Sequence, residues 1–171
     1  MLPTISDDAV FKVLGDFLTG ALPAATPIMQ AQDNLVGMPK GGFVTMNNNG
    51  KKRLATNVTD YQKDTPIAGY KNIRVSTQYT IQLDFYGAQS GMWATTVQTL
   101  FRDEYAASIM PDNIQPLYAD DPIQIPLITG ERNYLERWKL MVYMQYNPVV
   151  AVPQQYAIEL DVNGEVVEAN F

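Results

Sequence analysis

The chain contains no cysteine and no histidine. The first absence excludes disulfides, thiolate metal sites and cysteine nucleophiles. The second removes the commonest general base and the most frequent zinc ligand. Chemistry based on carboxylates, lysine or tyrosine stays open, but we expect a protein without catalytic activity, without a cofactor and without a metal.

Charge is also scarce, since only 18% of the 171 residues are charged. The 12 basic and 18 acidic residues give a net charge of −6. This balance disfavours tight general binding to nucleic acid, because such binding needs several cationic contacts to phosphates. Hydrophobic residues make up 46% of the chain, which argues against disorder. Much of the surface is left to uncharged polar residues, which suit contacts with other subunits.

Long apolar runs are missing too. No stretch approaches the ~20 apolar residues of a membrane span, and the N-terminus has no segment like a signal peptide. The length fits one domain. We therefore expect residues 1–171 to form a single structural domain without an export signal. Glycine-rich and asparagine-rich stretches, including the run from Asn47 to Arg53, predict a long loop or insertion around residues 33–72.

Two segments have the spacing of amphipathic helices. The first follows Ser6, a typical N-cap, and begins with acidic residues that complement the helix dipole. Its apolar stripe is Val10, Phe11, Leu14, Phe17, Leu18 and Ala21. The second begins near Ser90 and stops before Pro111. Its apolar face is Trp93, Val97, Leu100, Phe101 and Tyr105. Each stripe predicts that the helix packs on a core.

Strict alternation of apolar and polar residues predicts two long strands, over residues 73–85 and 134–147. Strands of this kind belong to an antiparallel sheet with one covered face. In the second strand, Trp138 lies on the apolar side, and the opposite side is unusually apolar because it carries Met141 and Tyr143. That side needs a cover of its own, from a helix or from another subunit.

The fold class predicted from these elements is α/β in the α+β sense, mainly an antiparallel sheet with two helices packed against it. Weaker alternation indicates short strands within residues 27–32 and 43–47. At the C-terminal end, residues 156–162 and 165–169 form a predicted hairpin. Asn163-Gly164 joins them, which is the strongest short-range signal for a type I′ turn.

Three short motifs suggest chemistry, and each has a simpler explanation. Gly41-Gly42 lacks the spacing of a phosphate-binding loop and is typical of a flexible turn. Asp120-Asp121 could bind calcium, but it lacks the ligand spacing of a calcium loop and favours a turn. Glu131 and Glu136 could act as an acid and base pair, although nothing in the sequence places them around a cleft.

The only basic run is Lys51-Lys52-Arg53, whereas the predicted last hairpin is acidic. Its acidic residues are Glu159, Asp161, Glu165 and Glu168. The two regions are either solvated surfaces or the opposite poles of a head-to-tail assembly. The candidate assembly interface consists of Lys51, Lys52, Arg53, Met141 and Tyr143.

An ordered set of motifs between residues 73 and 155 resembles the neck or tail terminator proteins of tailed bacteriophages. Residues 116–131 are Pro-Leu-Tyr-Ala-Asp-Asp-Pro-Ile-Gln-Ile-Pro-Leu-Ile-Thr-Gly-Glu. They are followed by Arg137-Trp138 and by Gln145-Tyr146-Asn147-Pro148-Val149-Val150. Upstream, Gln82-Leu83-Asp84-Phe85-Tyr86-Gly87 and Phe101-Arg102 fit the same pattern.

The resemblance implies a subunit of a ring, typically a hexamer, that caps the head-proximal end of the tail tube and joins it to the neck. The implied partners are other copies of the chain, the tail tube protein and neck or adaptor proteins, while DNA only passes through the lumen. The implied location is the virion, after assembly in the host cytoplasm. Alternatives are a head-tail adaptor or another tail-completion protein and, from a different class, a small carboxylate-dependent hydrolase or ligand-binding domain.

Overall fold

The computed structural model describes residues 1–31, 39–65, 68–125, 127–128, 134–155, 159–162 and 165–168. They form mostly antiparallel sheets with helices packed against them, which confirms the predicted α+β fold. None of the described helices is long and apolar enough to span a membrane. The helices are α1 (Asp7–Ala21), α2 (Ser90–Phe101) and α3 (Glu104–Ile109). The strands are β1 (Ile28–Gln30), β2 (Phe43–Arg53), β3 (Val58–Lys63), β4 (Ala68–Arg74), β5 (Thr77–Tyr86), β6 (Ile114–Ala119), β7 (Ile123–Gln124), β8 (Leu127–Ile128), β9 (Tyr134–Leu135), β10 (Arg137–Tyr146), β11 (Val149–Gln155), β12 (Glu159–Val162) and β13 (Glu165–Glu168).

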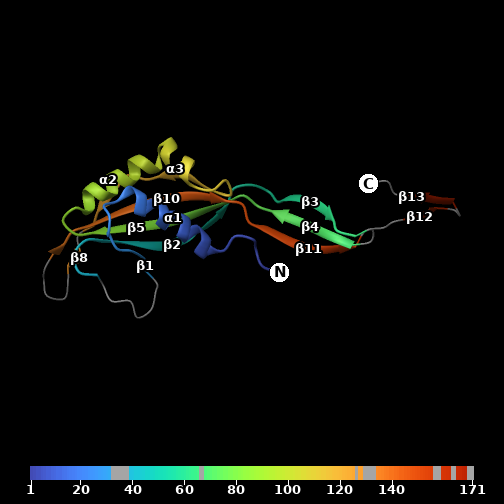
Figure 1. Cartoon of the computed structure of the whole chain (residues 1–171), viewed down its shortest axis with the longest axis horizontal. Coiled ribbons are helices and arrows are strands. Elements are labelled where there is room, and N and C mark those ends of the chain that lie inside the picture. The colour runs from blue at the N-terminus through green and yellow to red at the C-terminus, as the bar shows by residue number, and fades with distance from the viewer. Residues whose placement is uncertain are drawn as a thin grey trace.

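The main sheet has the strand order β1-β2-β5-β10-β6, with β7 also paired to β10. One face is apolar and buried: Tyr79, Ile81, Leu83 and Phe85 of β5, and Leu140, Val142 and Met144 of β10. Both α1 and α2 lie on this face, since the ring of Phe17 meets that of Phe101 edge-on at 5.6 Å. Figure 1 shows the helices over this sheet, and we call the sheet with its helices the body.

The first helix forms as its sequence predicts. The Ser6 side chain caps it by accepting a hydrogen bond from the Ala9 N–H at 3.2 Å. Val10, Leu14 and Leu18 are completely buried, because helical spacing directs them all toward the sheet.

A second sheet extends beyond the body. Strands β3, β4 and β11 form it in the order β11-β4-β3, and we call it the arm. The predicted long strand over residues 73–85 is therefore two strands, since it breaks at Val75-Ser76 and its first residues belong to β4. The pairs Thr77 with Tyr146 and Arg74 with Val149 lie on either side of the break. The strands β4–β5 and β10–β11 thus run as one ribbon from the body into the arm (Figure 1).

The predicted loop at Asn47 to Arg53 is wrong, because these residues continue strand β2 along β5. A bulge between Asn48 and Lys51 absorbs extra residues, with Gly50 at a positive φ of 115°. Asn48 accepts a hydrogen bond from the Gly50 N–H inside it. Besides β2, all of β3 and the first residues of β4 fall within residues 33–72, so the described part of that range is largely strand. Pairing with β5 and β11 overrides the loop-like local composition.

The second predicted helix is interrupted. It ends at Phe101, and α3 starts at Glu104, so the body has three described helices instead of the two expected. The predicted C-terminal hairpin is confirmed in its pairing, because β12 and β13 run antiparallel with Val162 opposite Glu165. Its expected turn, Asn163-Gly164, and residues 156–158 lie outside the described residues.

Candidate assembly surface

The main sheet has a second face, which points away from the helices and which we call the open face. It carries alternate residues of three strands: Phe43, Thr45 and Asn47 of β2, Gln78, Thr80, Gln82, Asp84 and Tyr86 of β5, and Arg137, Lys139, Met141, Tyr143 and Gln145 of β10. Met141 and Tyr143 lie here, half-buried, as the alternation predicted. No described helix covers this face.

A buried carboxylate lies in the open face. The Asp84 side chain is only 2% exposed and pairs with Arg137, whose Nε and Nη2 lie 3.1 and 3.0 Å from Oδ1. Its other oxygen accepts hydrogen bonds from Asn47 at 3.1 Å and Gln82 at 2.9 Å. Because four donors hold the carboxylate, it is a fixed structural acceptor and not a free general base.

A cavity of about 550 Å³ opens beside this network. Phe43 and Tyr86 stack on its wall with ring centroids 4.4 Å apart, and the Arg137 guanidinium lies 5.7 Å from the Tyr86 ring. Burial raises the pKa of Tyr86, and the negative charge of Asp84 raises it further. Tyr86 therefore stays a neutral phenol at physiological pH and offers the cavity an aromatic ring and a hydrogen-bonding hydroxyl.

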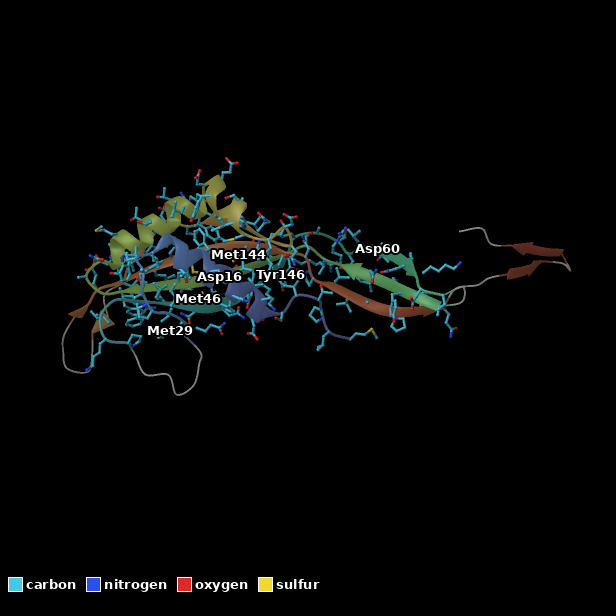
Figure 2. The ribbon with its side chains drawn as sticks, viewed as in Figure 1. Asp16, Met29, Met46, Asp60, Met144 and Tyr146 are labelled. Atoms are coloured by element: carbon cyan, nitrogen blue, oxygen red, sulfur yellow. The ribbon has the colours of Figure 1, made fainter. Side chains whose placement is uncertain are left out.

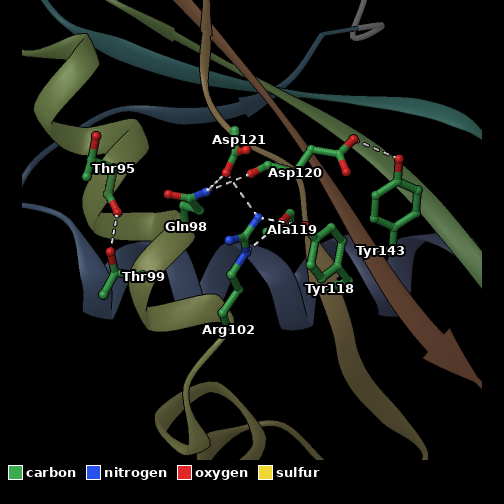
Figure 3. Close-up of polar contacts among 9 residues, drawn as sticks. All are labelled: Thr95, Gln98, Thr99, Arg102, Tyr118, Ala119, Asp120, Asp121 and Tyr143. Carbon is green, nitrogen blue, oxygen red and sulfur yellow. Dashed lines mark hydrogen bonds and ion pairs between the residues drawn. The ribbon is translucent and has the colours of Figure 1, made fainter.

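A second polar network joins the open face to the helix layer around the edge strand β6 (Figure 3). The Tyr143 hydroxyl donates to Asp120 Oδ2 at 2.9 Å, and this hydrogen bond is the main reason why the pKa of Tyr143 is raised. Gln98 of α2 donates to the Asp120 carbonyl at 3.1 Å and to Asp121 Oδ1 at 2.6 Å. The network fixes β6 to both layers.

Arg102, just after α2, completes this network. Its guanidinium lies 4.6 Å from the Tyr118 ring and donates to the Ala119 carbonyl at 2.7 Å and to the Tyr118 hydroxyl at 2.9 Å. It also pairs with Asp121 at 3.2 Å. Hydrogen-bond donors within the protein thus already contact Asp120 and Asp121, the pair considered above as calcium ligands. Among the described residues, no group of three or more His, Cys, Asp or Glu side chains could hold a metal ion.

The basic run lies at the junction of body and arm, and its members differ. Lys51 points to the helix side, where it pairs with Asp7 and lies 5.1 Å from the Tyr79 ring. Burial is the largest single influence on the pKa of Lys51 and lowers it, but the hydrogen bond to Asp7 together with the interactions with Tyr146 and the Asp7 charge raises the pKa overall. Arg53 donates to Asn57 at 2.6 Å, while Lys52 is exposed opposite Gln78. The structure therefore does not bring Lys51 together with Met141 and Tyr143, which lie on the other face.

The remaining sequence candidates have structural roles. Glu136 accepts a hydrogen bond from Trp138 Nε1 at 3.0 Å, and Glu131 lies outside the described residues. Gly42 packs so closely against Gly87 that a Cβ on Gly87 would lie 2.9 Å from the Gly42 Cα. Gly87 also has a φ of 105°, so the glycines serve a tight backbone contact and not a phosphate.

A groove also runs between α2 and the sheet. It has a volume of about 620 Å³ and is lined by Gly91, Met92, Thr95, Thr96, Thr99, Leu100 and Trp138. The threonine hydroxyls donate to the carbonyls four residues earlier, at 2.9 to 3.0 Å, so their polarity is satisfied within the helix.

A family model described as phage neck terminator protein matches residues 8–170. The match spans nearly the whole chain. The chain belongs to the phage neck terminator family. This confirms the resemblance drawn from the motifs between residues 73 and 155. No curated protein matches the chain.

Membership of the phage neck terminator family gives the open face and the arm their context. Proteins of this family are structural components of the phage virion and are not known as enzymes. The chain therefore has a structural role in the tail or neck and contacts other tail or neck proteins. Surfaces suited to protein contact are what such a role requires.

Proposed function

We propose that this neck terminator forms a closed ring that caps the head-proximal end of the tail tube and joins it to the neck. The family match carries the proposal. The arrangement of the body supports it, because all described helices lie on one side of the sheet and half-buried Met141 and Tyr143 lie on the other. A closed ring needs two different patches that meet on adjacent copies, and the open face supplies one of them.

The proposed partners are further copies of the chain, six in the simplest ring, together with the tail tube protein and a neck or adaptor protein. DNA passes through the lumen only transiently. The net charge of −6 favours this, since few cations are available to hold phosphates. The subunit assembles in the host cytoplasm and then resides in the virion.

Electron microscopy and mass measurement of the purified protein, with and without tail tubes, test this function. We expect rings at high protein concentration, or at tube ends when tubes are added. A strictly monomeric protein that never caps tubes contradicts the proposal. Binding to the portal complex but not to the tube assigns the chain to the head-tail adaptors instead.

A charge placed on the open face makes the test specific to a surface. Met141→Lys should weaken ring formation about tenfold, because the interface would have to bury an unpaired charge. Leu2→Lys is the matched control, since Leu2 is 87% exposed at the N-terminus. Equal assembly of the two variants removes the open face from the interface.

A further inference from the structure

The described residues of the arm form no core of their own. Among the described residues of β3, β4 and β11, only Gly69 is buried. The side chains of β3 are all exposed, including Tyr61 at 60%. In Figure 2, the labelled Asp60 lies on the arm, apart from Met144 and Tyr146 in the body. A three-stranded sheet needs a covered apolar face for stability, so this shape points to a cover from outside the chain.

The strand register separates two faces of the arm. One face, which we call the lysine face, carries Thr59, Tyr61, Lys63, Lys71, Ile73, Val150, Val152 and Gln154. It combines apolar side chains with two lysines and has no carboxylate. Asp60 lies on the opposite face, where its Oδ2 accepts a hydrogen bond from Asn72 at 3.2 Å. Neither Lys63 nor Lys71 forms an ion pair within the described part of the chain.

The helix layer has the complementary character. The α2 groove is apolar, with Met92 71% exposed at one end and Leu100 near the other. Immediately beyond it, exposed Asp103 and Glu104 stand at the junction of α2 and α3 and form no ion pair among the described residues. Ile109, at the other end of α3, is 48% exposed. An apolar surface ending in carboxylates matches a face of apolar residues and lysines.

We propose that the lysine face of one copy's arm packs on the outer surface of α2 and α3 of the next copy. This inference rests on the ring proposed above and names two further patches, the lysine face and the α2–α3 surface, that meet on adjacent copies. The arm runs away from the helices, so it is directed away from α2 and α3 of its own chain (Figure 1). Two different patches on each copy give a head-to-tail contact, which closes into a ring when the rotation allows.

Charge reversal tests the contact from both sides. The double variant Lys63→Glu with Lys71→Glu places an acidic arm against the acidic α2–α3 surface of the next copy. The double variant Asp103→Lys with Glu104→Lys places a basic α2–α3 surface against the basic arm. Each double variant should need at least about tenfold more protein for ring formation. Lys12→Glu with Lys40→Glu is the control for the arm variant, because it makes the same charge change on exposed residues of the body. Circular dichroism and thermal melting confirm that each variant is folded.

Mixing the two reversed proteins is the decisive measurement. An equimolar mixture should form rings again, because each reversed arm then meets a reversed helix surface and each native arm meets a native one. Rescue only within a single chain carrying all four changes places the contact inside one subunit and overturns the proposal. The arm contact is also overturned if the arm variant forms rings at the wild-type concentration, or if it loses only the capping of tubes. Either result leaves the proposed ring intact. Failure of the wild type to form rings would instead reject the proposed function.

Discussion

The body and the arm are built on the same strands but are stabilised in different ways. In the body, α1 and α2 cover one face of the sheet and bury a continuous core from Ile5 to Tyr146. In the arm, no described helix packs on the continuing strands, and the described side chains form no buried cluster. Backbone pairing alone can therefore extend a sheet, but the sheet is stable by itself only where other elements pack on its apolar face.

The largest expected effect compares a core residue with an arm residue. Phe85→Ala should lower the free energy of unfolding by about 3–5 kcal/mol, because Phe85 is completely buried and leaves a cavity. Tyr61→Ala in the arm should change it by less than about 0.5 kcal/mol in the unassembled subunit. Urea denaturation measures both. Similar losses in the two variants would mean that the arm is stabilised like the body.

Two aspartates sharpen the comparison at polar sites. Asp84→Ala should lower the free energy of unfolding by about 2–3 kcal/mol, because it leaves Arg137 without its partner. The loss is smaller than for a fully buried ion pair, since the Arg137 side chain is 23% exposed. Asp60→Ala removes only an exposed hydrogen bond to Asn72, so a change below about 0.5 kcal/mol is expected. The same denaturation experiment compares them. A cost for Asp84→Ala no greater than for Asp60→Ala would refute the structural role of the buried network.

The pH dependence of the body gives a smaller effect. Burial, followed by the charge of Asp7, raises the pKa of Tyr79 above its ordinary value of 10.0. The folded state therefore holds the proton more tightly, and this stability is present below pH 10.0 and is lost as the pH rises above it. Tyr79→Phe should make unfolding less sensitive to pH in that range.

The same variant has an effect at neutral pH. The buried Tyr79 hydroxyl interacts with the Asp7 side chain, so its removal should change the free energy of unfolding by no more than about 1 kcal/mol. Thermal melts at pH 7 and above pH 10 measure both effects. An unchanged dependence on pH would contradict the burial of this phenol.

The smallest effect on stability concerns the edge of the arm. The N–H and C=O of Val149 point away from β4 and form hydrogen bonds with Thr4. Backbone groups of every second residue in a strand point to the same side, so the backbone nitrogen of Pro153 faces the same outer edge. Pro153 therefore offers no N–H for further pairing. Pro153→Thr should change unfolding by less than about 0.5 kcal/mol but increase self-association in light scattering. Association equal to that of the wild type would show that this edge is protected in another way.

Local patterns predicted the elements whose own residues supply the signal. The Ser6 cap and the stripe from Val10 to Leu18 specify α1 without any partner, and the alternation in residues 134–147 located the main part of β10. The run from Asn47 to Arg53 was missed, because its strand conformation depends on β5 across a bulge. The end of α2 at Phe101 was missed as well, because the apolar spacing continues through the break.

The candidate surface divides in the same way. Alternation alone placed Met141 and Tyr143 on a shared face, but it could not place Lys51 on the opposite side of the sheet. The α2 groove needs Trp138 of β10 beside Leu100, residues that are far apart in the chain. The arm depends on the pairing of β3, β4 and β11, strands on which no described helix packs, and this pairing has no local signal in the sequence.

By itself, the sequence determined that the chain lacks cysteine and histidine, that it has two apolar helix stripes and alternating strands, and that its motifs resemble phage terminators. These properties are local, because they depend on residue identity and spacing. Only the tertiary structure decided that both stripes cover one face, that the ribbon continues into an uncovered arm, and that the basic run is divided between two faces. Those properties depend on contacts between distant residues, which a one-dimensional pattern does not specify.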